Sequence, residues 1–276
     1  MRIRFSLIAT TACAALVAAL ASGCSAAKGP TPDGTWTPAG RTTVSSLTGA
    51  EGIASTADGA LVHRGPGSIP LAVRGQGFQH VGDLDIARGS TFDAYERKGS
   101  GKMFLVTTAG GKRLEFRHAL DRGELFNNSF VTVSPDGQWI VAGEFGAQKR
   151  LQVFPAPLLN TSTSPGANLP QAGQVTLDHV VDNIQGCDFF SAQRLLCTAD
   201  QGDLLRLDLP HTLDGRKIDA AVTDLFTLPK VSKCSGAYEA EGIDYDTKTD
   251  TLRAGMLSPG LCKGSTVVFS FTWKAT

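Results

Sequence analysis

A short pattern recurs along this chain and restricts its fold more than any other feature of the sequence. Each copy has a small residue, a short apolar strand, a polar turn and a second apolar strand. The copies begin at or near Gly52, Gly82, Ser129, Gly186 and Gly242. Their spacing suits structural repeats of about 40 to 50 residues with connecting loops of variable length.

The clearest copy runs from Ser129 to Val141 and shows why the repeat forms strands. In its turn, Pro135 presets the first turn dihedral and Gly137 accepts a positive φ, so the chain reverses tightly. The flanking β-branched and aromatic residues suit strands that are buried on both faces. A small sheet of this kind buries both faces only between neighbouring sheets, and a ring of sheets achieves this with few exposed edges. The sequence therefore predicts an all-β fold, a single β-propeller.

The number of strands in each copy suggests how the ring closes. The third copy is predicted to have strands at 129–134, 138–145, 150–155 and 174–181, and the fourth at 185–190, 194–198, 203–209 and 221–228. The fifth copy supplies only three strands, at 241–246, 251–256 and 265–273. A strand at 42–47 would complete it, so that the N-terminal strand closes the last blade. This interpretation favours five blades, with six as the alternative if strands have been merged.

The N-terminus has the features of an export signal. Arg2 and Arg4 precede an apolar run without acidic residues, and small residues follow that run before Cys24. The end of the run resembles a lipobox, although Ala21 stands where Leu or a similar aliphatic residue is preferred. The resemblance implies that Cys24 is acylated. We therefore predict a lipoprotein-type signal peptide over 1–23, a flexible tether over 24–40 and the propeller domain over 41–276.

Charge and location limit the partners that the chain can have. The sequence contains 26 Lys and Arg and 26 Asp and Glu. It shows no basic footprint for nucleic acid and no polybasic patch for a membrane surface. We expect a protein exported to the extracytoplasmic face of the cell membrane and held there by its lipid anchor, or else one that is freely secreted. The remaining expected partner is a protein, a small molecule or a glycan.

Four cysteines remain after the signal peptide and the lipidation position are set aside. An even number in an exported chain predicts disulfides. Cys187 and Cys197 lie symmetrically about the centre of a hairpin turn, where opposed residues come within disulfide reach. Cys234 and Cys262 fall in two loops that share one face of a propeller. The predicted pairs are therefore 187–197 and 234–262.

Single hairpins of the chain resemble known propellers. The segment 134–143 resembles the Ser-Pro-Asp-Gly hairpin of WD40-like blades. The segments 51–54 and 241–244 resemble inner strands in exported propellers of the phytase-like and lactonase-like groups. The chain as a whole is similar to uncharacterised exported bacterial proteins. These resemblances support the fold, while propellers host unrelated activities.

Carboxylates cluster where the predicted inner strands begin, around the expected central channel. The residues predicted at or just below this rim are Glu51, Asp83, Asn128, Gln185, Glu241, Asp85, Asp188 and Asp244. Converging carboxylates could bind Ca²⁺ through their oxygens, and the lactonase-like resemblance would give a metal role only to Glu51 or Glu241. A pair of them could instead act as general acid and base, as in glycoside hydrolysis. The competing interpretation is that these acids bond backbone N–H groups at strand ends.

Other kinds of catalytic site find little support in the sequence. The chain has no Gly-x-Ser-x-Gly nucleophile motif, and its five histidines are scattered without metal-ligand spacing. The loops 121–128 and 230–240 should share the rim face and could grip a partner. The leading hypothesis is a membrane-anchored binding or scaffold module, and the alternative is a hydrolase of the glycosidase or metal-dependent lactonase type.

Overall fold

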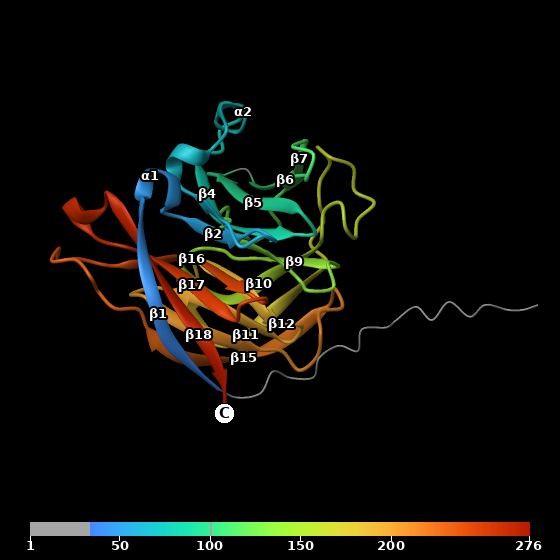
Figure 1. Cartoon of the computed structure of the whole chain (residues 1–276). Coiled ribbons are helices and arrows are strands. Elements are labelled where there is room, and N and C mark those ends of the chain that lie inside the picture. The colour runs from blue at the N-terminus through green and yellow to red at the C-terminus, as the bar shows by residue number, and fades with distance from the viewer. Residues whose placement is uncertain (1–33, 100) are drawn as a thin grey trace, which may run out of the picture.

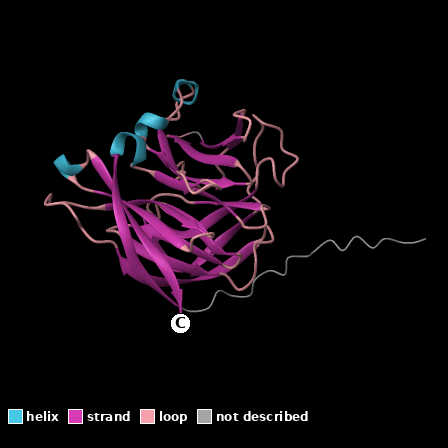
Figure 2. Cartoon of the chain, in the orientation of Figure 1, coloured by secondary structure: helices cyan, strands magenta, loops and turns pink. Residues whose placement is uncertain are grey.

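The computed structural model describes residues 34–99 and 101–276, and nearly all of the regular structure in these residues is β-strand (Figure 2). The predicted signal peptide and Cys24 lie outside this described part. In the residues that the structure describes, no helix combines the length and the apolar character needed to cross a bilayer. The short helical turns are α1 (Ser46–Gly49), η1 (Pro66–Ser68), α2 (Leu71–Gly75) and η2 (Gly260–Cys262).

The strands form antiparallel groups that follow one another along the chain (Figure 1). The first two groups consist of β2 (Gly52–Ser55) with β3 (Leu61–Arg64), and of β4 (His80–Ala87), β5 (Ser90–Arg97), β6 (Gly101–Thr107) and β7 (Arg113–His118). The third group consists of β8 (Val131–Val133), β9 (Trp139–Ala142), β10 (Ala147–Pro155) and β11 (Gly173–Asp182). The fourth group consists of β12 (Gly186–Ser191), β13 (Arg194–Ala199), β14 (Asp203–Asp208) and β15 (Lys217–Thr227). The last consists of β16 (Glu239–Asp246), β17 (Thr251–Leu257), β18 (Ser265–Ala275) and β1 (Gly34–Ser45).

The first strands of these groups form a closed ring. β2 contacts β4, β4 contacts β8, β8 contacts β12, β12 contacts β16, and β16 returns to β2. The outer strands β11 and β15 also pair in parallel, which joins the third and fourth groups into one eight-stranded sheet. The prediction of an all-β propeller is confirmed by this arrangement. The first group has two strands where a full blade has four, and the preference for five blades over six stays a prediction.

The N-terminal strand closes the ring, as predicted, but it is longer than the sequence suggested. β1 pairs with β18 from Gly34 opposite Ala275 to Ser45 opposite Ser265. Residues 46 and 47 belong to α1 rather than to this strand. The predicted tether over 24–40 is therefore too long, because residues 34–40 are part of β1. Trp36 explains the difference: its ring lies 5.6 Å from Phe190 and 4.9 Å from Trp273, which anchors this segment to the core.

Alternating side chains fill the spaces between neighbouring sheets. In β13, Leu195 and Cys197 join the apolar cluster shared with the third group, whereas Leu196 joins the cluster shared with the last group. Successive side chains of a strand point to opposite faces, so a strand between two sheets needs apolar residues at every position. The sequences of strands that lie between two sheets are therefore short continuous apolar runs.

Both predicted disulfides are present. Cys187 and Cys197 are directly paired across the β12–β13 hairpin, and both are buried in the core. Cys234 and Cys262 join the loop before β16 to η2, and both are partly exposed. The second disulfide therefore connects two loops on the same face of the propeller.

Candidate functional site

We call the face on which the inner strands begin the entry face. The segments that lead directly into the inner strands therefore lie on this face. These segments include α1, α2 and the loop 119–130, and Figure 1 shows α1 and α2 at the end of the molecule away from the C-terminus. Large apolar side chains are also exposed in segments of this face, at Leu47, Leu71, Leu125, Phe145 and Leu261.

Glycines bring the inner strands unusually close together beneath this face. A Cβ on Gly242 would lie 2.6 Å from the Cα of Gly52, and one on Gly186 would lie 2.5 Å from Oδ2 of Asp83. Pairing is also irregular next to Gly82 in β4 and Gly242 in β16. Such bulges turn a side chain away from the regular alternation. Here they allow the carboxyl group of Asp83 to lie between three inner strands.

Asp83 fastens these strands to one another. Its Oδ1 accepts hydrogen bonds from the backbone N–H groups of Ile53 and Leu84, and its Oδ2 accepts one from Ile243, each at 2.9 Å. The side chain is buried, and burial raises its pKa well above the usual range of an aspartic acid. Asp83 was predicted at the rim, but the structure places it below the rim as a structural link.

Above Asp83 lies a cavity of about 290 Å³, which we call the entry-face cleft. Four carboxylates and one imidazole dominate its lining, together with amide, hydroxyl and aromatic side chains. The lining residues are Glu51, His80, Glu96, Asn127, Ser129, Phe145, Gln185, Glu239 and Glu241. The cleft thus combines four acidic side chains with a phenyl ring, since Phe145 is 41% exposed.

His80 lies between two of the carboxylates. Its Nε2 is 3.4 Å from Glu51 Oε2, and its Nδ1 is 3.7 Å from Glu96 Oε1. Burial by itself would lower the pKa of His80, but the hydrogen bond and charge of Glu51 and the charge of Glu96 raise it above its usual value. His80 therefore compensates part of the negative charge on one side of the cleft.

Glu241 lies deepest among the carboxylates of the cleft. It is almost fully buried, and burial, together with the negative charges of Glu51 and Glu239, raises its pKa well above the usual range. Glu239 and Glu241 share one side of β16, because side chains alternate along a strand. A hydrogen bond between the two carboxyl groups favours the protonated form of Glu241. Lys263 lies 3.5 Å from Glu239, and His80 faces Glu51 and Glu96, so two basic side chains offset part of the charge of the four acids. A cationic group of a ligand would interact with the acids that remain charged.

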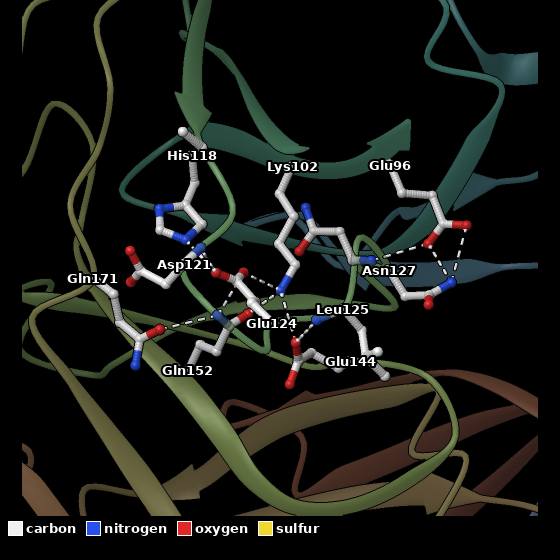
Figure 3. Close-up of polar contacts among 12 residues, drawn as sticks. Glu96, Lys102, His118, Asp121, Glu124, Leu125, Asn127, Glu144, Gln152 and Gln171 are labelled. Atoms are coloured by element: carbon white, nitrogen blue, oxygen red, sulfur yellow. Dashed lines mark hydrogen bonds and ion pairs between the residues drawn. The ribbon is translucent and has the colours of Figure 1, made fainter. Parts of the chain in front are cut away.

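One wall of the cleft is a loop that buried acids hold in place (Figure 3). Glu96 accepts hydrogen bonds from Asn127 Nδ2 and from the backbone N–H of Asn128. Glu144 accepts one from the backbone N–H of Leu125 at 2.6 Å. Asn128, predicted at the rim, is fully buried and donates to the carbonyl groups of Tyr95 and Met103. Beside it, the Oγ of Ser129 is buried and has no hydrogen-bond partner among the described residues.

Behind this wall a buried charge network fixes the start of the same loop (Figure 3). The ammonium group of Lys102 lies 2.7 Å from Glu124 and 3.6 Å from Glu144, with no exposure of its side chain. His118 contacts the other oxygen of Glu124 at 2.8 Å through Nε2, while its Nδ1 donates to the carbonyl of Leu169. Burial raises the pKa of a carboxyl group, but the hydrogen bonds from His118, Lys102 and Gln152 outweigh this and hold the pKa of Glu124 far below its usual range.

In the described residues, His118, Asp121 and Glu124 make up the single group of three side chains whose metal-binding atoms all lie within 4.8 Å. Lys102 contacts the same carboxylate, so its positive charge opposes a metal ion there. The predicted rim acids, Glu51 and Glu241 included, form no such group within the described chain. In the described chain, no three carboxylates of the cleft have oxygens that all lie within 4.8 Å of one another.

The remaining predicted acids lie at the opposite end of the ring. Asp85, Asp188 and Asp244 line a second cavity of about 450 Å³ where the inner strands end. Each accepts a hydrogen bond from the backbone of the next inner strand, at Val133, Tyr245 and Ser55 respectively. Burial raises the pKa of Asp85 to about 6. These three acids bond separate backbone groups, and Asp85 and Asp188 also accept hydrogen bonds from the hydroxyl of Thr132.

Of the residues predicted at the rim, the structure places Glu51, Gln185 and Glu241 in the cleft. No site prediction from the sequence covered three other lining residues, His80, Glu96 and Glu239. The inner strands β4 and β16 begin two residues earlier than the repeat pattern indicated. The signal that could have revealed one of them is the spacing of Glu239 and Glu241, which puts both carboxylates on one side of a strand. Nothing in the sequence indicated Glu96, because it lies on a second strand of its group.

No protein-family model matches the chain, and no curated protein matches it. Solved structures that are similar include the β-propeller domain of Myceliophteria_thermophila Cps50 (Swd1), at 12% identity, 75% coverage of this chain, 57% of that chain and a TM-score of 0.37. The Malassezia sympodialis allergen Mala s 1 has 14% identity, with 70% and 56% coverage and a TM-score of 0.42. YCF48 from Cyanidioschyzon merolae has 13% identity, with 78% and 62% coverage and a TM-score of 0.41. The chain covers less than two thirds of each of these structures, and the propeller assignment rests on its own strand pairing.

Proposed function

We propose that this protein is an exported, lipid-anchored binding module that takes a cationic group of its ligand into the entry-face cleft. The observation that carries the proposal is the acidic lining of the cleft. Four carboxylates line a cavity of about 290 Å³ together with one imidazole and an exposed phenyl ring. An ammonium or guanidinium group can hydrogen-bond to several separated carboxylates and also contact an aromatic face.

The spread of the carboxylates favours an organic cation over a metal ion. A metal needs oxygens within a few Å of one centre, and the rim acids form no such group in the described residues. A guanidinium carries five N–H donors on a flat fork and so reaches carboxylates that stand further apart.

The position of the tether supports a role at a membrane surface. β1 begins at Gly34, which pairs with Ala275 at the end of the molecule away from α1 and α2 (Figure 1). A lipid on Cys24 would attach ten residues earlier, within a span of about 33–36 Å of extended chain. The entry face would then point away from the membrane. Two disulfides fit an oxidising compartment outside the cytoplasm.

A binding titration tests the cleft. The probe is N-acetyl-arginine amide, which carries one cation and no other charge, titrated into the purified protein by calorimetry. Glu51→Gln or Glu239→Gln should weaken binding about 10-fold, because a charge-assisted hydrogen bond contributes about 1.5–3 kcal/mol. Asp219→Asn, an exposed acid on the outer strand β15, serves as the matched control. Binding that is absent at millimolar probe, or unchanged in both cleft variants, would contradict the proposal.

A second experiment tests the anchor. The full chain is expressed in bacteria that process lipoproteins, with radiolabelled palmitate in the medium. The wild-type protein should take up label and sediment with membranes, whereas Cys24→Ser should remain unlabelled. An unlabelled wild-type protein in the culture medium would instead establish free secretion.

A hydrolase is the second candidate, because one observation favours it. Glu241 is a buried acid of raised pKa next to the more exposed Glu239, and two carboxyl groups in unlike environments can serve as acid and base. Hydrolysis of nitrophenyl glycosides that Glu241→Gln abolishes would support this function. Hydrolysis that persists in Glu241→Gln would assign the activity to other residues.

A further inference from the structure

Another cavity, which we call the adjoining cavity, borders the entry-face cleft and contributes basic side chains. It has a volume of about 460 Å³ and is lined by Gly77, Gln79, His80, Glu96, Arg97, Lys98 and Phe126. The two cavities share His80 and Glu96, so they meet at these side chains. Beyond this junction, one cavity presents Glu51, Glu239 and Glu241, and the other presents Arg97 and Lys98.

The basic side of this groove is partly preorganised. Arg97 donates a hydrogen bond from Nη1 to the carbonyl of Gln76 at 2.9 Å, and its guanidinium lies 5.4 Å from the centre of the Phe78 ring. These contacts hold its charge at the wall of the cavity. Lys98 is exposed in the turn after β5, where its ammonium group can turn toward a ligand.

Building on the proposed function, we propose that the ligand is a peptide segment with a basic side chain and, a few residues away, an acidic side chain. The basic side chain enters the acidic cleft, and the acidic one meets Lys98 and Arg97. His80 spans the junction, since its two ring nitrogens face Glu51 and Glu96. The two cavities meet at His80 and Glu96, so a peptide that crosses this junction would carry its two charges a few residues apart, at about 3.3–3.6 Å for each residue.

The surroundings of the groove favour a peptide over a zwitterionic lipid headgroup. Phe145 lines the cleft and Phe126 lines the adjoining cavity, so each subsite has a ring against which apolar parts of a peptide can pack. Leu125, which precedes Phe126 in the chain, is also exposed. A tether that leaves from the opposite end of the molecule directs this groove away from the membrane that holds the anchor.

Three blocked tetrapeptides test the proposal with the full chain. Acetyl-Arg-Ala-Ala-Asp-amide carries both charges, acetyl-Arg-Ala-Ala-Asn-amide carries the cation alone, and acetyl-Gln-Ala-Ala-Asp-amide carries the anion alone. Calorimetry should give at least a 10-fold tighter dissociation constant for the first peptide than for either of the others. Lys98→Glu should lower the affinity for the first peptide to the affinity that the wild-type protein has for the cation-only peptide. Lys112→Glu, an exposed lysine in the turn between β6 and β7, should leave the affinity unchanged.

The outcomes separate this inference from the proposed function. Equal binding of the first two peptides would overturn the dipolar ligand and leave the cation site standing. Failure of both Arg peptides to bind would overturn both proposals. Binding to phosphatidylcholine vesicles that is lost in both Glu239→Gln and Lys98→Glu would replace the peptide by a lipid headgroup.

Discussion

The carboxyl group of Asp83 on β4 accepts a hydrogen bond at 2.9 Å from the backbone N–H of Ile243 on β16, 160 residues further along the chain. The same carboxyl group also holds Ile53 on β2. Three inner strands that belong to different groups thus meet at one side chain, directly below the entry-face cleft. The stability of the ring and the shape of the cleft therefore depend on the same residue.

Replacing Asp83 should destabilise the whole domain. Asp83→Ala would leave the buried N–H groups of Ile53 and Ile243 without an acceptor, at about 1–3 kcal/mol each. We expect a loss of about 2–5 kcal/mol in the free energy of unfolding, measured by urea denaturation. Asp219→Asn on the exposed side of β15 should change it by less than about 0.5 kcal/mol. A loss in Asp83→Ala no larger than that of the control would show that the link is unimportant.

The buried Lys102 should tolerate substitution only together with its partner. Lys102→Met removes the ammonium group that Glu124 and Glu144 share and leaves them with His118 and Arg150 as basic partners, which should cost about 3–5 kcal/mol. Combining it with Glu124→Gln should cost less than the sum of the two single substitutions, because the partners interact directly. Additive losses in a double-mutant cycle would indicate that the two groups are energetically independent.

Asp85 should make the protein more stable in mild acid than at neutral pH. Burial raises its pKa from the unfolded value of 3.8 to about 6, so the folded state holds a proton that the unfolded state releases. The contribution to the free energy of unfolding is full below about pH 4 and is lost as the pH rises to about 6. It amounts to at most about 3 kcal/mol. Urea denaturation across this range should show a shallower dependence in Asp85→Asn. An unchanged slope in this variant would assign the pH dependence to other groups.

The two disulfides should differ in their response to a reductant. Cys234 and Cys262 are partly exposed, whereas Cys187 and Cys197 are buried in the core. Under mild reduction with an alkylating agent, mass spectrometry should find Cys234 and Cys262 modified first. Removing this pair should also cost about 3–4 kcal/mol, because it closes a loop of 28 residues. Earlier modification of Cys187 would show that the β12–β13 hairpin opens before the entry-face loops.

The local features of this protein could be predicted from its sequence. The Ser134–Gly137 turn depends on residues adjacent in the chain, and Gly137 takes the positive φ, 73°, that the sequence predicted for this turn. The pairing of Cys187 with Cys197 could also be predicted, because the two residues lie on adjacent strands of one hairpin, although the structure adds a register shift between Phe189 and Ser191. Apolar runs separated by turns predicted many short strands that need neighbours on both faces, and hence the propeller.

The tertiary structure decided where the carboxylates point. Asp83 and Glu241 lie close to glycines at irregular pairing, and the close approach of Gly242 to Gly52 depends on strands 190 residues apart. One acid consequently links backbones while the other lines a cleft. Glu96 joins Glu51 and Glu241 only because the sheets pack side by side. No pattern along a single strand records that proximity, since it results from the packing of different sheets.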